Sequence, residues 1–87
     1  MAMNNNDLAS IKHILEKLIN KNRIGGNHVE ITQLRRWGLT EKALKFLINN
    51  FLLQSKNSDN NKELAVNPHN IKEVYRIINE VNDISEL

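Results

Sequence analysis

The feature that most restricts how this chain can fold is the spacing of its apolar residues, which follows a helical repeat near both ends. Near the N-terminus they recur every three or four positions, in Leu8, Ile11, Ile14, Leu15, Leu18 and Ile19. The same spacing returns near the C-terminus, in Ile71, Val74, Ile77, Ile78, Val81 and Ile84. Such spacing places apolar side chains on one face of a helix. The sequence therefore predicts a helix near each end, each with an apolar face that needs covering.

Capping and turn residues set the expected limits of the first helix. Asn6 or Asp7 can cap its start by accepting hydrogen bonds from backbone amides of the first turn. Gly25 and Gly26 are expected to end it, because glycine readily adopts the left-handed conformation found at helix C-termini. Polar and apolar residues then alternate over residues 28–31, which is typical of a very short strand.

Two short helices are predicted in the middle of the chain, separated by a glycine. Thr32 can cap the first, whose apolar side is formed by Leu34 and Trp37. Gly38 interrupts this helix, and Thr40 can cap the second. The apolar stripe of the second helix is expected to be buried and to comprise Ala43, Leu44, Leu47, Ile48 and Phe51.

A β-hairpin and a final helix complete the predicted order of elements. Residues 51–56 and 63–66 are predicted strands, and residues 57–62 between them are almost all turn formers. Pro68 suits the first turn of the final helix, where its missing N–H is not needed. The expected fold class is mainly α-helical with a small β-hairpin, in the order α-β-α-α-β-β-α, ending in a long C-terminal helix.

Parts of this pattern resemble the winged helix-turn-helix family of DNA-binding domains. The segment Ile31 to Leu44, ITQLRRWGLTEKAL, resembles the two helices and the glycine-containing turn of that family. Phe51 to Gln54 resembles the strand that leaves the recognition helix, and Leu64 to Pro68 resembles the returning strand of the wing. Asn50 stands where many members have glycine. The segment Ile31 to Leu39 is also slightly shorter than is usual in the family.

The resemblance implies a winged helix over residues 7–67, after a disordered N-terminus at residues 1–6. The helix over residues 68–87 resembles those that pair two subunits in small dimeric repressors and archaeal winged-helix proteins. The residues expected to form a two-fold dimer contact are Ile71, Val74, Ile78 and Val81. The alternative is that the apolar face of this helix is covered within one subunit.

Charge is distributed unevenly along the chain, although the net charge is only +2. Residues 8–62 hold ten Lys and Arg against four acidic residues, whereas residues 63–87 hold two against five. A basic body of this kind is typical of proteins that bind a polyanion such as nucleic acid. The alternative is that these charges form an ordinary solvated surface.

The resemblance assigns DNA reading to the helix over residues 40–50, whose first turns would face base edges. Arg35 and Arg36 lie on the preceding helix, where the family contacts the DNA backbone, and Lys56 and Lys62 flank the tip of the wing. Lysine can bond to guanine edges, and asparagine to adenine edges. The candidate DNA-binding residues are Arg35, Arg36, Thr40, Lys42, Lys45, Asn49, Lys56 and Lys62.

No catalytic or metal-binding pattern accompanies these residues. The chain has no cysteine, and its three histidines do not share the spacing of a metal site. No glycine-rich phosphate loop is present. We therefore expect no enzymatic activity, no cofactor and no metal. The longest apolar run is three residues, so no membrane contact is expected, and the expected location is cytoplasmic and associated with the nucleoid.

Three functions remain open from the sequence. The first is a sequence-specific double-stranded DNA-binding protein acting as a dimeric transcriptional regulator. The second is a plasmid or viral DNA segregation protein that binds centromere-like sites. The third, of another class, is a winged-helix adaptor that binds protein. Basic residues gathered on one face would favour DNA, whereas an exposed apolar patch on the third helix or the wing would favour a protein partner.

Overall fold

A computed structural model describes the backbone at residues 4–58 and 61–86, and the side chains at residues 4–56 and 62–80. Eight elements follow one another in it: α1 (Asn5–Asn20), β1 (Val29–Glu30), α2 (Ile31–Arg36), α3 (Glu41–Asn49), β2 (Leu53–Ser58), β3 (Asn61–Val66), the short 3-10 helix η1 (Pro68–Asn70) and α4 (Ile71–Glu86). The described chain is thus mainly helical with a small antiparallel sheet, as the sequence predicted at the level of class. None of the helices in the described ranges has the length and apolar character needed to cross a membrane.

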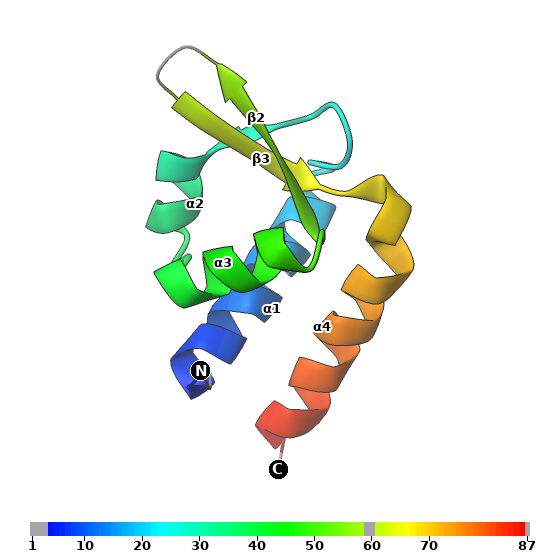
Figure 1. Cartoon of the computed structure of the whole chain (residues 1–87). Helices are drawn as coiled ribbons and strands as arrows, with labels where there is room; N and C mark the ends of the chain where they lie inside the picture. The colour runs from blue at the N-terminus through cyan, green and yellow to red at the C-terminus, as the bar shows by residue number, and fades with distance from the viewer. Residues whose placement is uncertain (1–3, 59–60, 87) are drawn as a thin grey trace.

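The sheet has three strands in the order β1-β3-β2, all antiparallel to their neighbours. Its long part is the hairpin of β2 and β3, which extends away from the helices in Figure 1. The predicted turn over residues 57–62 was too long, because the ladder continues to the pair Ser58 and Asn61. Backbone pairing with the opposite strand prevails here over the turn preference of the side chains. The hairpin is therefore longer than expected, and residues 59 and 60 lie outside the described residues.

The core lies between the helices and the inner face of the sheet. Helix α1 runs through the middle of the molecule and packs against α3, α4 and β3 (Figure 1). The largest fully buried side chains come from every part of the described chain and are Ile11, Ile14, Leu15, Leu18, Leu34, Leu47, Leu52, Leu64, Val66 and Val74. In the described residues, both terminal helices therefore bury apolar side chains that their spacing predicted: α1 packs against α3, α4 and β3, and α4 packs against α1. The side chains of Val81 and Ile84 lie outside the described residues.

Helix α1 begins earlier than expected. Its N-cap is Asn4, whose side chain accepts a hydrogen bond from the Asp7 amide at 2.9 Å. The Asp7 carboxylate in turn accepts from the Asn4 amide at 3.3 Å, which completes a capping box. The expectation that Asn6 or Asp7 caps the helix was wrong, since both lie within its first turn. Asn5 and Asn6, expected in a disordered start, are helical.

Asn22, and not the glycine pair, ends α1. Asn22 has a left-handed backbone with φ of 57°, and its amide donates to the carbonyl of Ile19 at 3.0 Å. The next amide, of Arg23, donates to the carbonyl of Leu18 at 2.8 Å. These two bonds satisfy the carbonyls at the helix end in the pattern usually closed by glycine. Asparagine tolerates this conformation better than most residues, so the expected stop at Gly25 came too late.

The two middle helices begin and end largely as predicted, with one exception. Gly38, with φ of 102°, separates them, and the Thr40 hydroxyl caps α3 by accepting from the Ala43 amide at 3.2 Å. Both predictions are confirmed. Thr32 does not cap α2, because that helix begins at Ile31 with Glu30 as its N-cap. The Thr32 hydroxyl instead points to the Glu30 carboxylate at 3.5 Å.

Phe51 does not belong to the buried stripe of α3, contrary to expectation. Ala43, Leu44 and Leu47 are buried and Ile48 is half-buried, but the Phe51 side chain is 68% exposed. Phe51 ends the helix with a left-handed φ of 58°, and Leu52 takes the buried position after it. The left-handed conformation of Phe51 reverses the chain direction, so the Phe51 side chain points to the surface and the Leu52 side chain enters the core.

The strained conformation of Phe51 gives a testable prediction. A left-handed backbone costs an L-residue about 1–2 kcal/mol, whereas glycine adopts it freely. Because the ring is mostly exposed, Phe51→Gly should raise the free energy of unfolding by about 1 kcal/mol, or the thermal midpoint by roughly 4–8 °C. The matched control is Asn50→Gly, where φ is −98° and glycine should lower stability. Destabilisation by Phe51→Gly in thermal unfolding would show that the ring makes contacts that outweigh the strain.

Candidate nucleic-acid interface

Helix α3 is held at its N-terminus by a hydrogen-bonded group that we call the α1–α3 junction, formed by Asp7, Ser10, Gly38 and Thr40. The Ser10 hydroxyl donates to the Gly38 carbonyl at 2.8 Å and accepts from the Thr40 amide at 3.1 Å. The Thr40 hydroxyl donates to the Asp7 carboxylate at 2.7 Å. Asp7 and Ser10 are 5% and 6% exposed, so these bonds form in a largely buried place. The junction fixes where α3 begins relative to α1.

Thr40 therefore has a structural role that the sequence did not assign to it. It was a candidate DNA-binding residue, but it is half-buried, and its hydroxyl both accepts from Ala43 and donates to Asp7. A hydroxyl has one hydrogen to donate, and here that hydrogen is used inside the chain. Thr40 positions the candidate interface and does not form part of its exposed surface.

The outward face of α3 carries Lys42, Lys45 and Asn49. Asn49 follows Lys42 by seven residues, about two helical turns, and Lys45 lies between them on the same side. All three side chains are exposed, and none is bonded to any described residue through an ion pair or a side-chain hydrogen bond. We call this the α3 face. It combines two cations with an amide, all of them free to meet a ligand.

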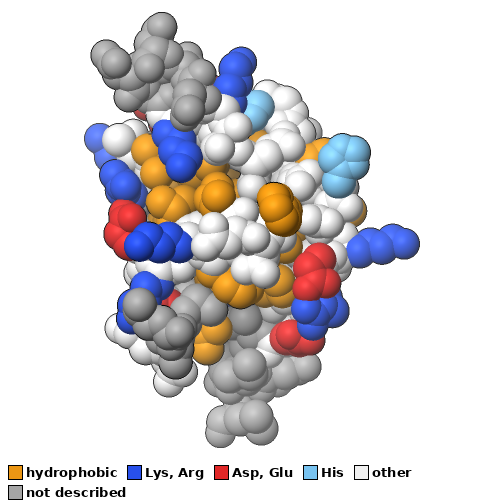
Figure 2. All heavy atoms as spheres, viewed as in Figure 1, with side chains coloured by type: hydrophobic (Ala, Val, Ile, Leu, Met, Phe, Trp, Pro, Cys, Tyr) orange, Lys and Arg blue, Asp and Glu red, His pale blue; other side chains and the backbone are white. Residues whose placement is uncertain are grey.

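An apolar area borders the α3 face. Phe46, four residues after Lys42, is half-buried and packs against the core cluster. Figure 2 shows hydrophobic side chains reaching the surface between α2, α3 and the hairpin, with Lys and Arg side chains around them. The surface is thus mixed: basic groups surround an apolar centre.

The two arginines of α2 differ in their surroundings. Arg35 forms an ion pair with Glu41 at the start of α3, at 3.0 Å. Both side chains are more than half exposed, so the pair contributes little to stability, but it offsets the Arg35 charge. Arg36 is exposed and takes part in no ion pair among the described residues. Of the two, Arg36 leaves more charge available to a phosphate.

The candidate residues of the hairpin lie near its end. Lys56 is exposed on β2, and its register partner on β3 is Glu63. Lys62 is partly buried, and its register partner is Asn57. Opposite charges that face each other across strands attract, so Glu63 offsets part of the Lys56 charge. The hairpin therefore presents a weaker basic surface than the α3 face.

Two of the four residues expected to pair subunits lie in the core of the chain itself. Val74 is fully buried, Ile78 is 8% exposed, and Ile71 is half-buried against the core cluster. Val74 and Ile78 thus pack mainly within one chain, and a dimer through this helix stays a prediction. The side chain of Val81 lies outside the described residues.

The exposed side of α4 pairs its charges within the helix. Arg76 forms ion pairs with Glu73 and Glu80, three residues before it and four after it. The hydrogen bond from Arg76, aided by its positive charge, holds the pKa of the Glu73 carboxyl below its ordinary value. This face of α4 is consequently close to balanced in charge, unlike the α3 face.

Sequence reasoning missed a second basic group, on α1. Lys17 and Lys21 place their ammonium groups over the ring of Trp37, at 4.8 and 5.7 Å from its centroid. With His13 they recur every four residues, a spacing that puts them on one side of the helix and could have been read from the sequence. What the sequence could not show is that Trp37, at the end of α2, lies beneath them.

Comparisons with protein-family models, with curated proteins and with solved structures gave no significant match. In the part of the chain that the structure describes, no group of His, Asp and Glu side chains is arranged to hold a metal ion.

The α1–α3 junction predicts a large effect from one small substitution. Thr40→Val keeps the shape of the side chain but removes both the cap of α3 and the bond to Asp7. We expect the free energy of unfolding to fall by about 1–3 kcal/mol. Thr32→Val is the matched control and should change it by less than about 0.5 kcal/mol, because Thr32 is exposed and caps nothing. Equal effects of the two substitutions in urea unfolding would contradict the role of the junction.

Proposed function

We propose that this chain is a winged helix-turn-helix domain that binds double-stranded DNA, with α3 in the major groove and the β2–β3 hairpin as the wing. The element order and the antiparallel sheet are compatible with that layout. The observation that carries the proposal is the α3 face, where Lys42, Lys45 and Asn49 are exposed and free of partners among the described residues. A helix with such a face, held at its start, matches what major-groove reading requires.

Each group in the proposal has a chemical role. Lys42 and Lys45 would release counterions from phosphates or donate to guanine O6 and N7, and Asn49 would bond to adenine N6 and N7. Arg36 and Lys56 would contact the DNA backbone on either side and fix the register of α3. Glu41, held by Arg35, complements the positive end of the α3 dipole.

The proposal concerns one domain on DNA, and the pairing of two such domains through α4 stays a separate prediction. Of the four residues expected at that contact, Val74 and Ile78 are buried within the chain, Ile71 is half-buried, and the Val81 side chain lies outside the described residues. Transcriptional regulation and DNA segregation remain the two biological uses that fit a domain of this kind. Both begin with the same physical event, the binding of a short duplex by the α3 face.

A second candidate function is supported by the apolar area beside the α3 face. Protein interfaces commonly place apolar side chains at their centre and charged ones at the rim. The hydrophobic side chains between α2, α3 and the hairpin have such a surround (Figure 2). A protein-binding adaptor would use the same surface. The two candidate functions therefore differ in the ligand, DNA or protein, and not in the residues that bind it.

Fluorescence anisotropy with labelled duplex DNA at several salt concentrations tests the proposal. We expect binding of random duplex in the micromolar range at low salt, weakening steeply as salt rises. Lys42→Gln with Lys45→Gln should reduce the slope of log K against log salt by about 2, since each lost phosphate contact removes about 0.9. The matched control, Lys12→Gln with Lys72→Gln, removes the same charge from other surfaces and should leave the slope nearly unchanged.

Two results would count against DNA binding. If the wild-type protein binds no duplex even at low salt, the protein-binding function takes its place. If the control variant, Lys12→Gln with Lys72→Gln, weakens DNA binding as much as the α3 variant, the protein attracts DNA through its overall charge. In that case α3 is not the helix that reads the major groove.

A further inference from the structure

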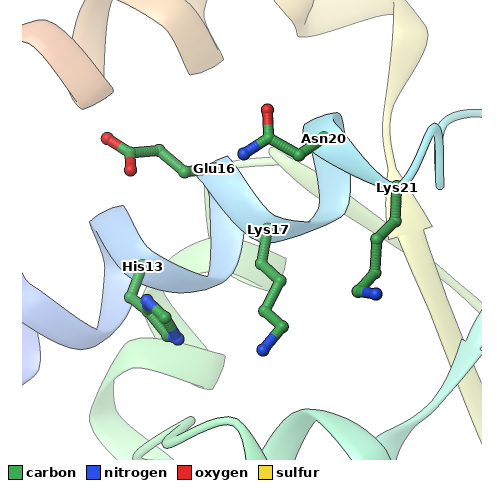
Figure 3. A pocket seen from close by; sticks show the side chains of 5 residues that line it. All are labelled: His13, Glu16, Lys17, Asn20 and Lys21. Carbon is green, nitrogen blue, oxygen red and sulfur yellow. The ribbon is translucent and has the colours of Figure 1, made fainter.

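One side of α1 carries a row of basic side chains that the proposed DNA contact does not use. His13, Lys17 and Lys21 are spaced four residues apart and line a shallow open groove together with Glu16 and Asn20. Figure 3 shows His13, Lys17 and Lys21 pointing to the same side of the helix, with Glu16 and Asn20 turned to the other. We call the three residues the α1 stripe.

Trp37 organises the cations of the stripe. Both ammonium groups lie over its ring, at 4.8 Å from the centroid for Lys17 and 5.7 Å for Lys21, so one aromatic ring holds two like charges. Neither takes part in an ion pair among the described residues. The acidic residue of the groove, Glu16, faces Lys12 at 3.9 Å. A pair of neighbouring cations without a carboxylate is a surface that favours an anionic ligand.

The stripe adjoins the turn between α2 and α3. Ser10, which bonds to the Gly38 carbonyl, lies on the same side of α1, because Lys17 and Lys21 follow it by about two and three helical turns. Trp37 immediately precedes Gly38 in the chain. Two separate contacts therefore place the stripe beside the turn that leads into α3.

We propose that the α1 stripe is a second contact for the DNA backbone, outside the stretch of duplex read by α3; this rests on the function proposed above. The stripe places two cations beside the residue that precedes the α2–α3 turn, where phosphates beyond the α3 site would meet Lys17 and Lys21, with His13 as a further donor. The residues lining the groove are all polar or charged. Such a lining suits hydrated phosphates, whereas a protein partner would require an apolar centre.

The test compares two duplex lengths in anisotropy titrations over a range of salt. A duplex of roughly 12 base pairs, little more than one helical turn, covers the α3 site, and one of roughly 30 base pairs extends well beyond it. Lys17→Gln with Lys21→Gln should reduce the salt slope by about 2 on the long duplex and leave it nearly unchanged on the short one. Lys42→Gln with Lys45→Gln should reduce the slope on both, and Lys12→Gln with Lys72→Gln on neither. Circular dichroism and thermal unfolding confirm that each variant is folded.

The outcomes separate this inference from the proposed function. If the stripe variant matches the Lys12 and Lys72 control on the long duplex while the α3 variant loses affinity, the inference is overturned and the proposed function stands. An equal loss on both duplexes also overturns it, since the stripe would then belong to the α3 site. If the stripe variant loses affinity on the long duplex and the α3 variant does not, α1 is the DNA surface and the proposed role of α3 is wrong.

Discussion

The placement of α3 depends on a buried junction in which two side chains of α1 hold the α2–α3 turn: Ser10 bonds to its backbone and Asp7 accepts from the Thr40 hydroxyl. Ser10 and Asp7 are almost fully buried, and each is bonded to a group about thirty residues away along the chain. A buried polar group that loses its partner costs free energy, so the junction is stable only when all its bonds form together. Every buried side-chain nitrogen or oxygen in the described residues does have a partner. The direction in which α3 presents its outer face follows from this arrangement.

Helix ends are the second constraint, and at two of them the chain uses residues other than glycine. Asn22 and Phe51 both adopt left-handed conformations, and each is followed by an amide that reaches back into the helix. At Phe51 the reversal is held in place by the side-chain amides of Asn67 and Asn70, which both donate to its carbonyl at 2.9 Å. The start of the final helix is thereby fastened to the end of α3. Because the β2–β3 hairpin lies between Phe51 and Asn67 in the chain, these hydrogen bonds hold both of its ends together.

The distribution of positive charge over the surface becomes clear when the cations that are paired with carboxylates are set aside. Lys12, Arg35 and Arg76 each face a carboxylate, and Lys56 has Glu63 as its register partner. Among the cations without a described ion pair, Lys42 and Lys45 lie together on the α3 face, and Lys17 and Lys21 lie together on the α1 stripe. A modest net charge of +2 is therefore compatible with two local groups of unpaired lysines.

The class of the fold and the order of its elements could be predicted from the amino-acid sequence alone. Helical spacing located both terminal helices, and Gly38 and Thr40 marked real boundaries, because periodicity and capping act over a few residues. Pro68 begins the short 3-10 helix η1 and not α4, which starts three residues later than expected, at Ile71. The sequence also placed Lys42, Lys45 and Asn49 on one helix face, since that depends on helical phase alone. Tertiary structure decided what required distant partners: the burial of Val74, the engagement of Thr40 with Asp7, and the position of Trp37 beneath Lys17 and Lys21. Local patterns could not supply these outcomes, because each depends on which element packs against which, and that is fixed by the shared core of the whole chain.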